Sequence, residues 1–345
     1  MNGVMLRLLV VIAIVLVRSE AQIERANNVI SEYEQSIEQW KVQMEIAESE
    51  TVRQKLSEER PSDEMAARRL YHEIGGRLAD QEVVPYIGWL FDTMPHFLQS
   101  GPELNEGEVV RDALLRYHYK TAGAGALCMK MYPYASVRDI EFMEKVATDA
   151  PLDADRGLAN LALSLALQQI GDESEVRLRR LEVLKQAIIQ VPAESTFEGR
   201  LCQDMIREQI FGIRYLSKGG TAPMFVSKLQ TGVEWRLEHE GRSGMVALAF
   251  LGELQPSGQV LDGVLSDMAD LLHQSGGELV LISTVTSEGR PYGVHLYDRD
   301  SQVTELYQVQ DMPSIILLDE SGTVQAKGEP GELINLAIRA LAEAL

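Results

Sequence analysis

Two near-continuous apolar runs, Met245 to Leu251 and Leu279 to Val285, constrain the fold of this chain most strongly. Between them, Val260 to Leu272 repeats apolar residues at helical spacing, so one face of a helix would be apolar. Such runs are typical of parallel strands that are buried on both faces of a sheet, and a parallel pair needs a crossover helix. The three segments therefore predict a βαβ unit.

The sequence changes character at Lys218-Gly219-Gly220. Before this point apolar residues recur at helical spacing, and Ser62 and Ser136 stand where typical N-caps would begin helices. After it, strand-like runs alternate with helical patterns. We therefore predict an all-helical domain over residues 61–217 and an α/β domain over residues 218–345.

The α/β domain is predicted to end in a hairpin and a helix. Ile315–Leu318 and Thr323–Ala326 flank the turn residues Asp319 to Gly322. A final segment, Leu333–Leu345, has one apolar helix face. The predicted fold class is thus α + α/β, with a central mixed sheet flanked by helices in the C-terminal domain.

A long helix is predicted over residues 22–60, and residues 23–50 of it carry an apolar heptad. Two interpretations are open: a coiled coil that joins copies into a homo-oligomer, or a long helix that lies on the domain after it. The two heptad positions are occupied by Ile23, Ile30, Ile37 and Met44, and by Ala26, Tyr33, Trp40 and Ala47.

The N-terminus resembles an export signal. Arg7 precedes an unbroken apolar run from Leu8 to Val17, which is shorter than the roughly 20 apolar residues of a membrane-spanning helix. Small residues follow at Ser19 and Ala21, so residues 1–21 fit a secretory signal peptide. Because Arg18 is unfavourable for cleavage, an uncleaved membrane anchor stays open, and in both cases the body of the protein is exported.

Charge limits the classes of partner. The chain has 32 basic and 52 acidic residues, a formal net charge of -20. A field of this sign repels phosphate backbones and anionic lipid, so we expect no nucleic-acid partner, and membrane contact only through an uncleaved N-terminus. The six histidines include no pair at i, i+4 spacing, and neither a metal site nor another cofactor is predicted. Gly123-Ala124-Gly125 follows a helical pattern, which argues against a phosphate loop.

Cys128 and Cys202 are the only cysteines, and both lie in the predicted helical domain. In an exported chain they can form one disulfide, or they can be two small buried apolar side chains. Neither belongs to a C-x-x-C pair or stands at a predicted helix start.

The C-terminal part resembles the thioredoxin-like domains of the TlpA and peroxiredoxin-related (redoxin) group, which are exported bacterial proteins. Gly220 to Phe225 is similar to the group's G-x-x-A-P-x-F opening, Tyr307 to Ser314 to the segment that ends in its cis-proline, and Ile315 to Thr323 to its hairpin. The resemblance covers about residues 218–345. It implies a thioredoxin-like fold, a cis bond before Pro313, and location in the periplasm or cell envelope.

The group's C-x-x-C motif would fall on Gln255-Pro256-Ser257-Gly258. Thiol–disulfide exchange needs a thiolate whose pKa is lowered at a helix N-terminus, and a resolving thiol beside it. Gln255 and Gly258 stand in the two cysteine positions and supply neither. We therefore expect no catalytic residue at this degenerate motif.

The favoured function is that of a non-catalytic binding or scaffolding protein. In the resembling group the backbone before the cis-proline pairs with a bound peptide, which needs no cysteine. A protein or peptide partner would then contact Gln255, Pro256, Ser257, Met312 and Pro313. One alternative is an enzyme, a thiol–disulfide oxidoreductase that uses Cys128 or Cys202. Another is a structural role, with the helical domain binding the partner.

Overall fold

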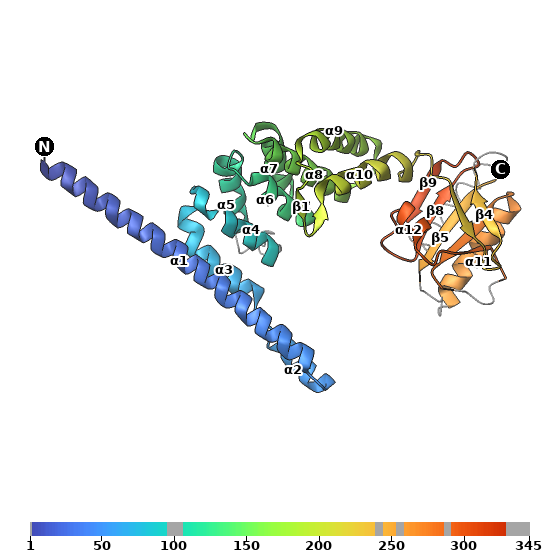
Figure 1. Ribbon diagram of the computed structural model, residues 1–345, viewed down its shortest axis with the longest axis horizontal. Helices are drawn as coiled ribbons and strands as arrows, with labels where there is room; N and C mark the ends of the chain where they lie inside the picture. Colours follow the sequence, from blue (N-terminus) through green and yellow to red (C-terminus); the bar gives the residue numbers. More distant parts are fainter. Residues whose placement is uncertain (1, 95–105, 239–243, 253–258, 286–290, 329–345) are drawn as a thin grey trace. The chain divides into compact units, whose positions relative to one another are not determined.

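The computed structural model describes residues 2–94, 106–238, 244–252, 259–285 and 291–328 (Figure 1). The chain forms two compact units, Met1–Ile206 and Arg207–Leu345, and their boundary falls within helix α10 (Cys202–Phe211). The first unit is helical and the second contains a mixed sheet, which confirms the predicted fold class.

The first unit begins with helix α1 (Asn2–Ile46), which α2 (Glu50–Glu58) and α3 (Asp63–Ile74) accompany in Figure 1. The heptad side chains face these helices. The Trp40 indole N–H donates to the Leu56 carbonyl at 2.7 Å, the Tyr33 hydroxyl donates to Asp63, and Ala26 is fully buried. The seam thus packs within the chain, on α3 as the second interpretation predicted and also on α2. The prediction of one helix over residues 22–60 is wrong, because α1 ends at Ile46 and Ser49 caps the separate helix α2. Use of the seam between copies stays a prediction. In the described part of the chain no helix is long and apolar enough to cross a membrane.

The remaining helices of the first unit pack mainly around α8, which contacts α6, α7 and α9. Ser62 and Ser136 accept hydrogen bonds from Met65 and Asp139 as helix N-caps, as predicted. The elements are η1 (Gly75–Arg77), η2 (Gln81–Val83), α4 (Val84–Thr93), α5 (Glu106–Ala113), the π-helix η4 (Leu114–His118), α6 (Ala124–Met131), η5 (Tyr132–Tyr134), α7 (Val137–Asp149), α8 (Asp153–Ile170), α9 (Ser174–Gln190) and the hairpin β1 (Thr196–Phe197) to β2 (Arg200–Leu201).

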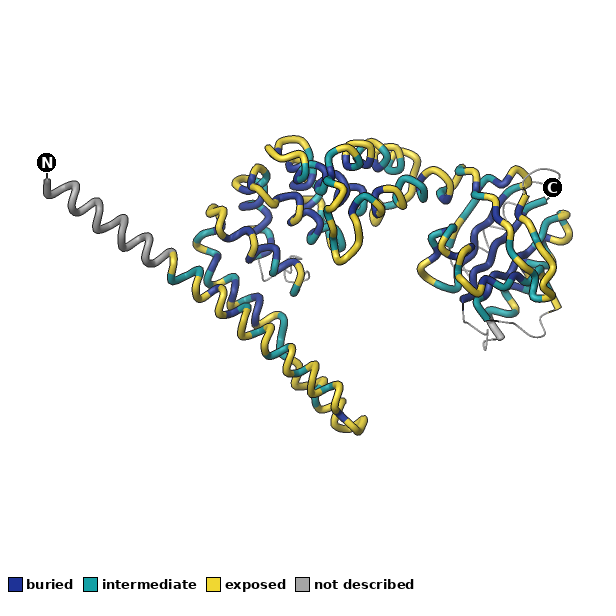
Figure 2. The backbone as a smooth tube through the Cα atoms, viewed as in Figure 1, coloured by how far each residue is buried: buried dark blue, intermediate teal, exposed yellow. Residues whose placement is uncertain are grey.

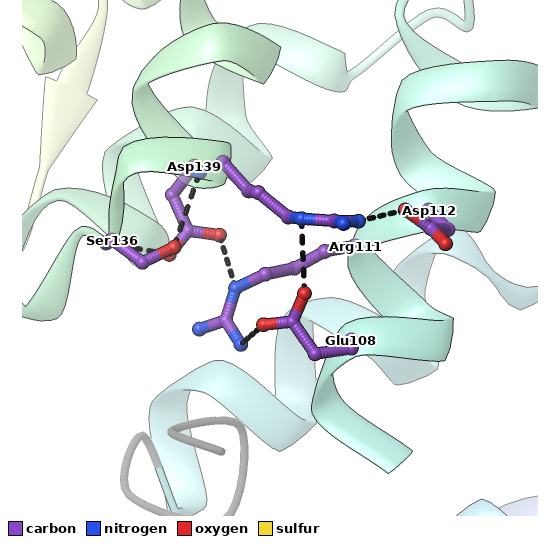
Figure 3. Close-up of polar contacts among 6 residues, drawn as sticks. Glu108, Arg111, Asp112, Ser136 and Asp139 are labelled. Atoms are coloured by element: carbon purple, nitrogen blue, oxygen red, sulfur yellow. Dashed lines mark hydrogen bonds and ion pairs between the residues drawn. The ribbon is translucent and has the colours of Figure 1, made fainter. Parts of the chain in front are cut away.

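A buried ion pair joins α5 to α7 (Figure 3). The Arg111 guanidinium donates from Nε to the Asp139 carboxylate at 2.9 Å, and the two side chains are 3% and 1% exposed. The other Asp139 oxygen accepts from the Ser136 backbone N–H at 2.8 Å, which completes a capping box at the start of α7. Glu108, between Arg111 and Arg138, extends the network toward the surface.

The second unit contains a five-stranded sheet in the order β7-β6-β5-β8-β9. Strands β5, β6 and β7 are parallel, while β8 and β9 are antiparallel to their neighbours, and α11 crosses over from β5 to β6. This is the predicted βαβ unit followed by the predicted hairpin. The elements are η6 (Gly212–Leu216), β3 (Phe225–Lys228), β4 (Glu234–Leu237), β5 (Val246–Gly252), α11 (Gln259–Gln274), β6 (Glu278–Ser283), β7 (Val294–Tyr297), α12 (Gln302–Leu306), β8 (Ser314–Leu318) and β9 (Val324–Gly328). The predicted helix Leu333–Leu345 lies outside the described residues.

Both faces of the sheet are covered, as the apolar runs require. Side chains of β5 alternate between two cores, and the whole strand is buried (Figure 2). One core includes Leu248, Phe250 and Tyr307, and the other includes Ala249 and the α11 residue Leu265. The central strand β5 therefore carries its last residues to one edge of a rigid layer, where a functional site would be supported.

Both outer strands are paired by the same segment of chain. Thr221 forms an antiparallel bridge with Thr323 beside β9. At the opposite edge, Leu229 forms an antiparallel bridge with Leu296 of β7, and the Gln230 N–H donates to the His295 carbonyl at 3.2 Å. The segment from residue 219 to residue 230 thus reaches from one edge of the sheet to the other.

Candidate functional site

The candidate site lies where β5 and β6 end and β8 begins. The Met312–Pro313 peptide bond is cis, as the family resemblance implied, and Pro313 directly precedes β8. Met312 and Pro313 are both partly buried. The other predicted site residues, Gln255, Pro256, Ser257 and the motif residue Gly258, lie outside the described residues.

Gly252, the last residue of β5, fits closely against Met312. Its φ of +60° is in the left-handed region, and its carbonyl accepts hydrogen bonds from the Ser283 hydroxyl at 2.8 Å and the Thr284 N–H at 3.1 Å. A Cβ atom at this position would lie 2.5 Å from the Met312 sulfur. Glycine therefore leaves room for the thioether across the end of β5, and any larger residue would displace the Met312 side chain. Sequence reasoning missed this residue, although a glycine at the end of an apolar strand is a signal for close approach.

The backbone before Pro313 has no hydrogen-bond partner among the described residues. Gln310 and Asp311 are exposed, and no backbone N–H or carbonyl of residues 310–312 hydrogen bonds to a described residue. The Thr284 hydroxyl, beside Gly252, is buried and also lacks a hydrogen-bond partner among the described residues. The site thus combines the apolar Met312 side chain with polar groups that no described residue pairs.

Two contacts fix the segment that leads to the site. Tyr307 is fully buried, its ring packs against Phe225 and Phe250, and its hydroxyl donates to the Pro223 carbonyl at 2.7 Å. Burial raises the pKa of Tyr307, so the hydroxyl stays protonated and keeps donating. The next residue, Gln308, donates from its side-chain amide to the Glu208 carbonyl at 3.1 Å. The segment is therefore anchored on the core before it reaches Met312.

The two cysteines do not provide a reactive thiol. Cys128 and Cys202 are free and fully buried, so the disulfide that the sequence left open is not formed. Burial, and then the nearby Asp155 carboxylate, raise the pKa of the Cys128 thiol well above its usual range. Cys202 begins α10, which corrects the expectation that neither cysteine stands at a helix start, but burial still raises the pKa of its thiol. Both are protonated at neutral pH.

The Gly123-Ala124-Gly125 segment binds a carboxylate of the chain itself. The N–H groups of Gly123 and Gly125 donate to the two oxygens of Asp155 at 3.1 and 3.0 Å, at the start of α6. The position where a phosphate would bind is thus filled by Asp155. Over the residues that the structure describes, no cluster of three or more histidine, cysteine or acidic side chains could hold a metal ion.

Comparison with known proteins gives no match to a family model and none to a curated protein. Solved structures do match. The thioredoxin domain of a thiol-disulfide oxidoreductase from Bacteroides vulgatus is 20% identical, with 36% of this chain and 98% of that chain covered and a TM-score of 0.32. A thiol:disulfide interchange protein from a Bacteroides species is 20% identical, with 36% and 91% covered and a TM-score of 0.32.

A third structure, a thioredoxin-like protein from Bacteroides caccae, is 14% identical, with 81% of this chain and 94% of that chain covered and a TM-score of 0.40. The order and directions of the strands, the α11 crossover and the cis bond before β8 describe a thioredoxin-like fold in this chain itself. The C-terminal part of the chain thus has a thioredoxin-like fold, as the sequence resemblance implied.

Proposed function

We propose that the C-terminal unit is a thioredoxin-like domain without thiol chemistry, which binds an extended segment of a protein partner along residues 310–313. One observation carries the loss of chemistry: residues 207–345 contain no cysteine. The two thiols of the chain are buried in the first unit and have raised pKa values. Because the thiolate is the nucleophile in disulfide exchange, neither supports the alternative of an oxidoreductase.

The binding role is supported by the groups that the site leaves unpaired. An extended partner segment adds to exposed backbone by main-chain hydrogen bonds, and side-chain pockets then give specificity. Residues 310–312 offer such backbone, and Met312 offers a thioether that adapts to apolar side chains of different shape. The rigid sheet below, and the anchors at Tyr307 and Gln308, hold this edge in place before the partner arrives.

Export belongs to the same proposal. The apolar run of residues 8–17 and the small residues after it support a signal peptide over residues 1–21, which would carry the protein to the periplasm or cell envelope. N-terminal sequencing of the protein purified from its natural host is expected to begin after residue 21. A mature protein that still starts at Met1 and remains inside the cell would contradict export.

The binding function is tested by panning a random decapeptide phage library on the full-length protein. The most enriched peptide is then titrated, with a fluorescein label, against wild type, Met312→Lys and the control Val233→Lys. Val233 is 60% exposed in the same unit, outside the candidate site, so its replacement matches the charge change. A loss of at least tenfold in affinity is expected for Met312→Lys, and less than twofold for Val233→Lys.

A peptide that binds Met312→Lys as tightly as wild type would contradict the proposed site. An insulin-reduction assay with dithiothreitol separates the enzymatic alternative. We expect no turnover above the uncatalysed rate. Turnover by the wild type that disappears in Cys128→Ser or Cys202→Ser would establish the oxidoreductase instead.

A further inference from the structure

A hollow of about 470 Å³ lies in the C-terminal unit between the end of α10, η6 and the residues before β3. It shares no residue with the segment 310–313. Its lining is almost entirely apolar, apart from one threonine, and consists of Phe211, Tyr215, Thr221, Ala222, Pro223 and Met224.

The floor of this hollow is fixed, while its rim is exposed. Phe211 packs against the core of the unit and lies 4.9 Å from the Tyr215 ring, centroid to centroid. Pro223 is held through its carbonyl by the Tyr307 hydroxyl. In contrast, Met224 is 64% exposed and Tyr215 is 41% exposed. Large apolar side chains gathered at a preformed hollow are typical of a surface that binds another molecule.

The charges next to Tyr215 indicate the chemistry of that molecule. Arg214 and Lys218 flank Tyr215 in the chain, and both are exposed. Neither side chain forms an ion pair or hydrogen bond with a described residue. Most arginines of the first unit do pair with carboxylates, as Arg68 does with Glu64 and Arg77 with Asp80. In a chain of net charge -20, two exposed cations close in sequence to the lining residues Tyr215 and Thr221 are complementary to an acidic partner.

We propose that this hollow binds a protein segment in which a bulky apolar side chain is flanked by carboxylates. The apolar side chain enters the hollow against Phe211, Tyr215 and Met224, and the carboxylates pair with Arg214 and Lys218. A concave lining favours an inserted side chain over a lipid surface, which is bound by protruding apolar residues. This surface is independent of the site proposed at Met312, so either can fail alone.

The test uses the full-length protein and a fluorescein-labelled nonapeptide with the sequence Glu-Glu-Ser-Glu-Trp-Glu-Ser-Glu-Glu. Fluorescence anisotropy gives its dissociation constant for wild type, for the double variant Arg214→Glu with Lys218→Glu, and for Met224→Ser. Two matched controls alter exposed residues of the same unit that lie outside the hollow, Lys228→Glu and Val233→Ser. Because all five residues are exposed, these replacements leave the core intact.

We expect the charge reversal and Met224→Ser each to weaken binding at least tenfold, and each control to change it less than twofold. Peptides with alanine for tryptophan, or lysine for glutamate, are expected to bind at least tenfold more weakly. Absence of measurable binding, or equal loss in the controls, would overturn the proposal. The proposal would also be overturned if the protein does not bind the peptide but cosediments with phosphatidylserine vesicles, and if this cosedimentation is lost in the variant with Arg214→Glu and Lys218→Glu.

Discussion

The buried pair between Arg111 and Asp139 predicts a large and specific effect of Asp139→Ala on the stability of the first unit. The substitution leaves the Arg111 guanidinium, 3% exposed, without its nearest carboxylate. Removing one partner of a buried ion pair costs about 3 to 5 kcal/mol. Glu108, 3.8 Å from Arg111, remains as a weaker partner, so the lower end of that range applies. Loss of the capping box at Ser136 adds about 1 kcal/mol, for a total of about 4 kcal/mol.

The measurement is urea unfolding followed by circular dichroism at 222 nm, which reports mainly the helical unit. With a slope of about 2 kcal/mol per molar urea, the midpoint is expected to fall by about 2 M. The control is Asp112→Ala, which removes an ion pair with Arg138 whose side chains are 47% and 45% exposed. Pairs this exposed contribute about 0–1 kcal/mol. Equal midpoint shifts for the two variants would refute the reasoning, because burial would then not decide the effect.

Three further predictions follow from local geometry. Gly252→Ala is expected to destabilise the second unit by about 1–2 kcal/mol from the left-handed backbone alone. The added methyl group is also expected to displace the Met312 side chain, which would shift the Met312 methyl signal in NMR spectra. An unchanged signal would contradict the close contact. Burial alone would raise the pKa of Asp319, but hydrogen bonds to its carboxylate, of which the one from the Ser321 side chain has the largest effect, lower the pKa overall. The stability that this group provides is therefore present above pH 3.8 and is lost as the pH falls through the folded-state pKa. Asp319→Asn should therefore be less stable than wild type at pH 7, with the gap closing below pH 4 in thermal melts; a constant gap would contradict this. Cys128 and Cys202 should not react with Ellman's reagent until the protein is unfolded, and rapid reaction of the native protein would show that one is accessible.

The elements that the sequence predicted are those whose signal is local. The apolar run of β5, the helical face of α11 and the Asp319 turn each follow from neighbouring residues. Burial on two faces leaves a continuous apolar run, burial on one face leaves a helical period, and a turn is marked by its residue types. The cis bond before Pro313 was expected from the family resemblance and from no local pattern. The N-cap at Ser136 also has a local signal, because the residue that completes its capping box, Asp139, is only three positions away.

Features of the site that depend on distant partners were not predictable in this way. Gly252 and Met312 lie far apart in the sequence, and nothing in either residue indicates that a sulfur atom lies 2.5 Å from the position that a Cβ of residue 252 would take. The helix start at Cys202 was missed because Leu201, which precedes it, is not an N-cap residue type. Arg111 was missed as a buried residue, because an arginine is exposed unless a partner such as Asp139 accompanies it into the core.

The segment from residue 219 to residue 230 runs from one edge of the sheet to the other, since it pairs with β9 at one end and with β7 at the other. Unpaired edge strands are templates for aggregation, and most proteins must protect each edge by a separate device. Here one piece of chain protects both, so the two edges are coupled. A single proteolytic cut at the exposed turn around Gly232, or a mutation that loosens residues 219–230, would weaken the pairing at both edges at once. Loosening of this one short segment would therefore expose backbone groups at Val324 and at Leu296 together.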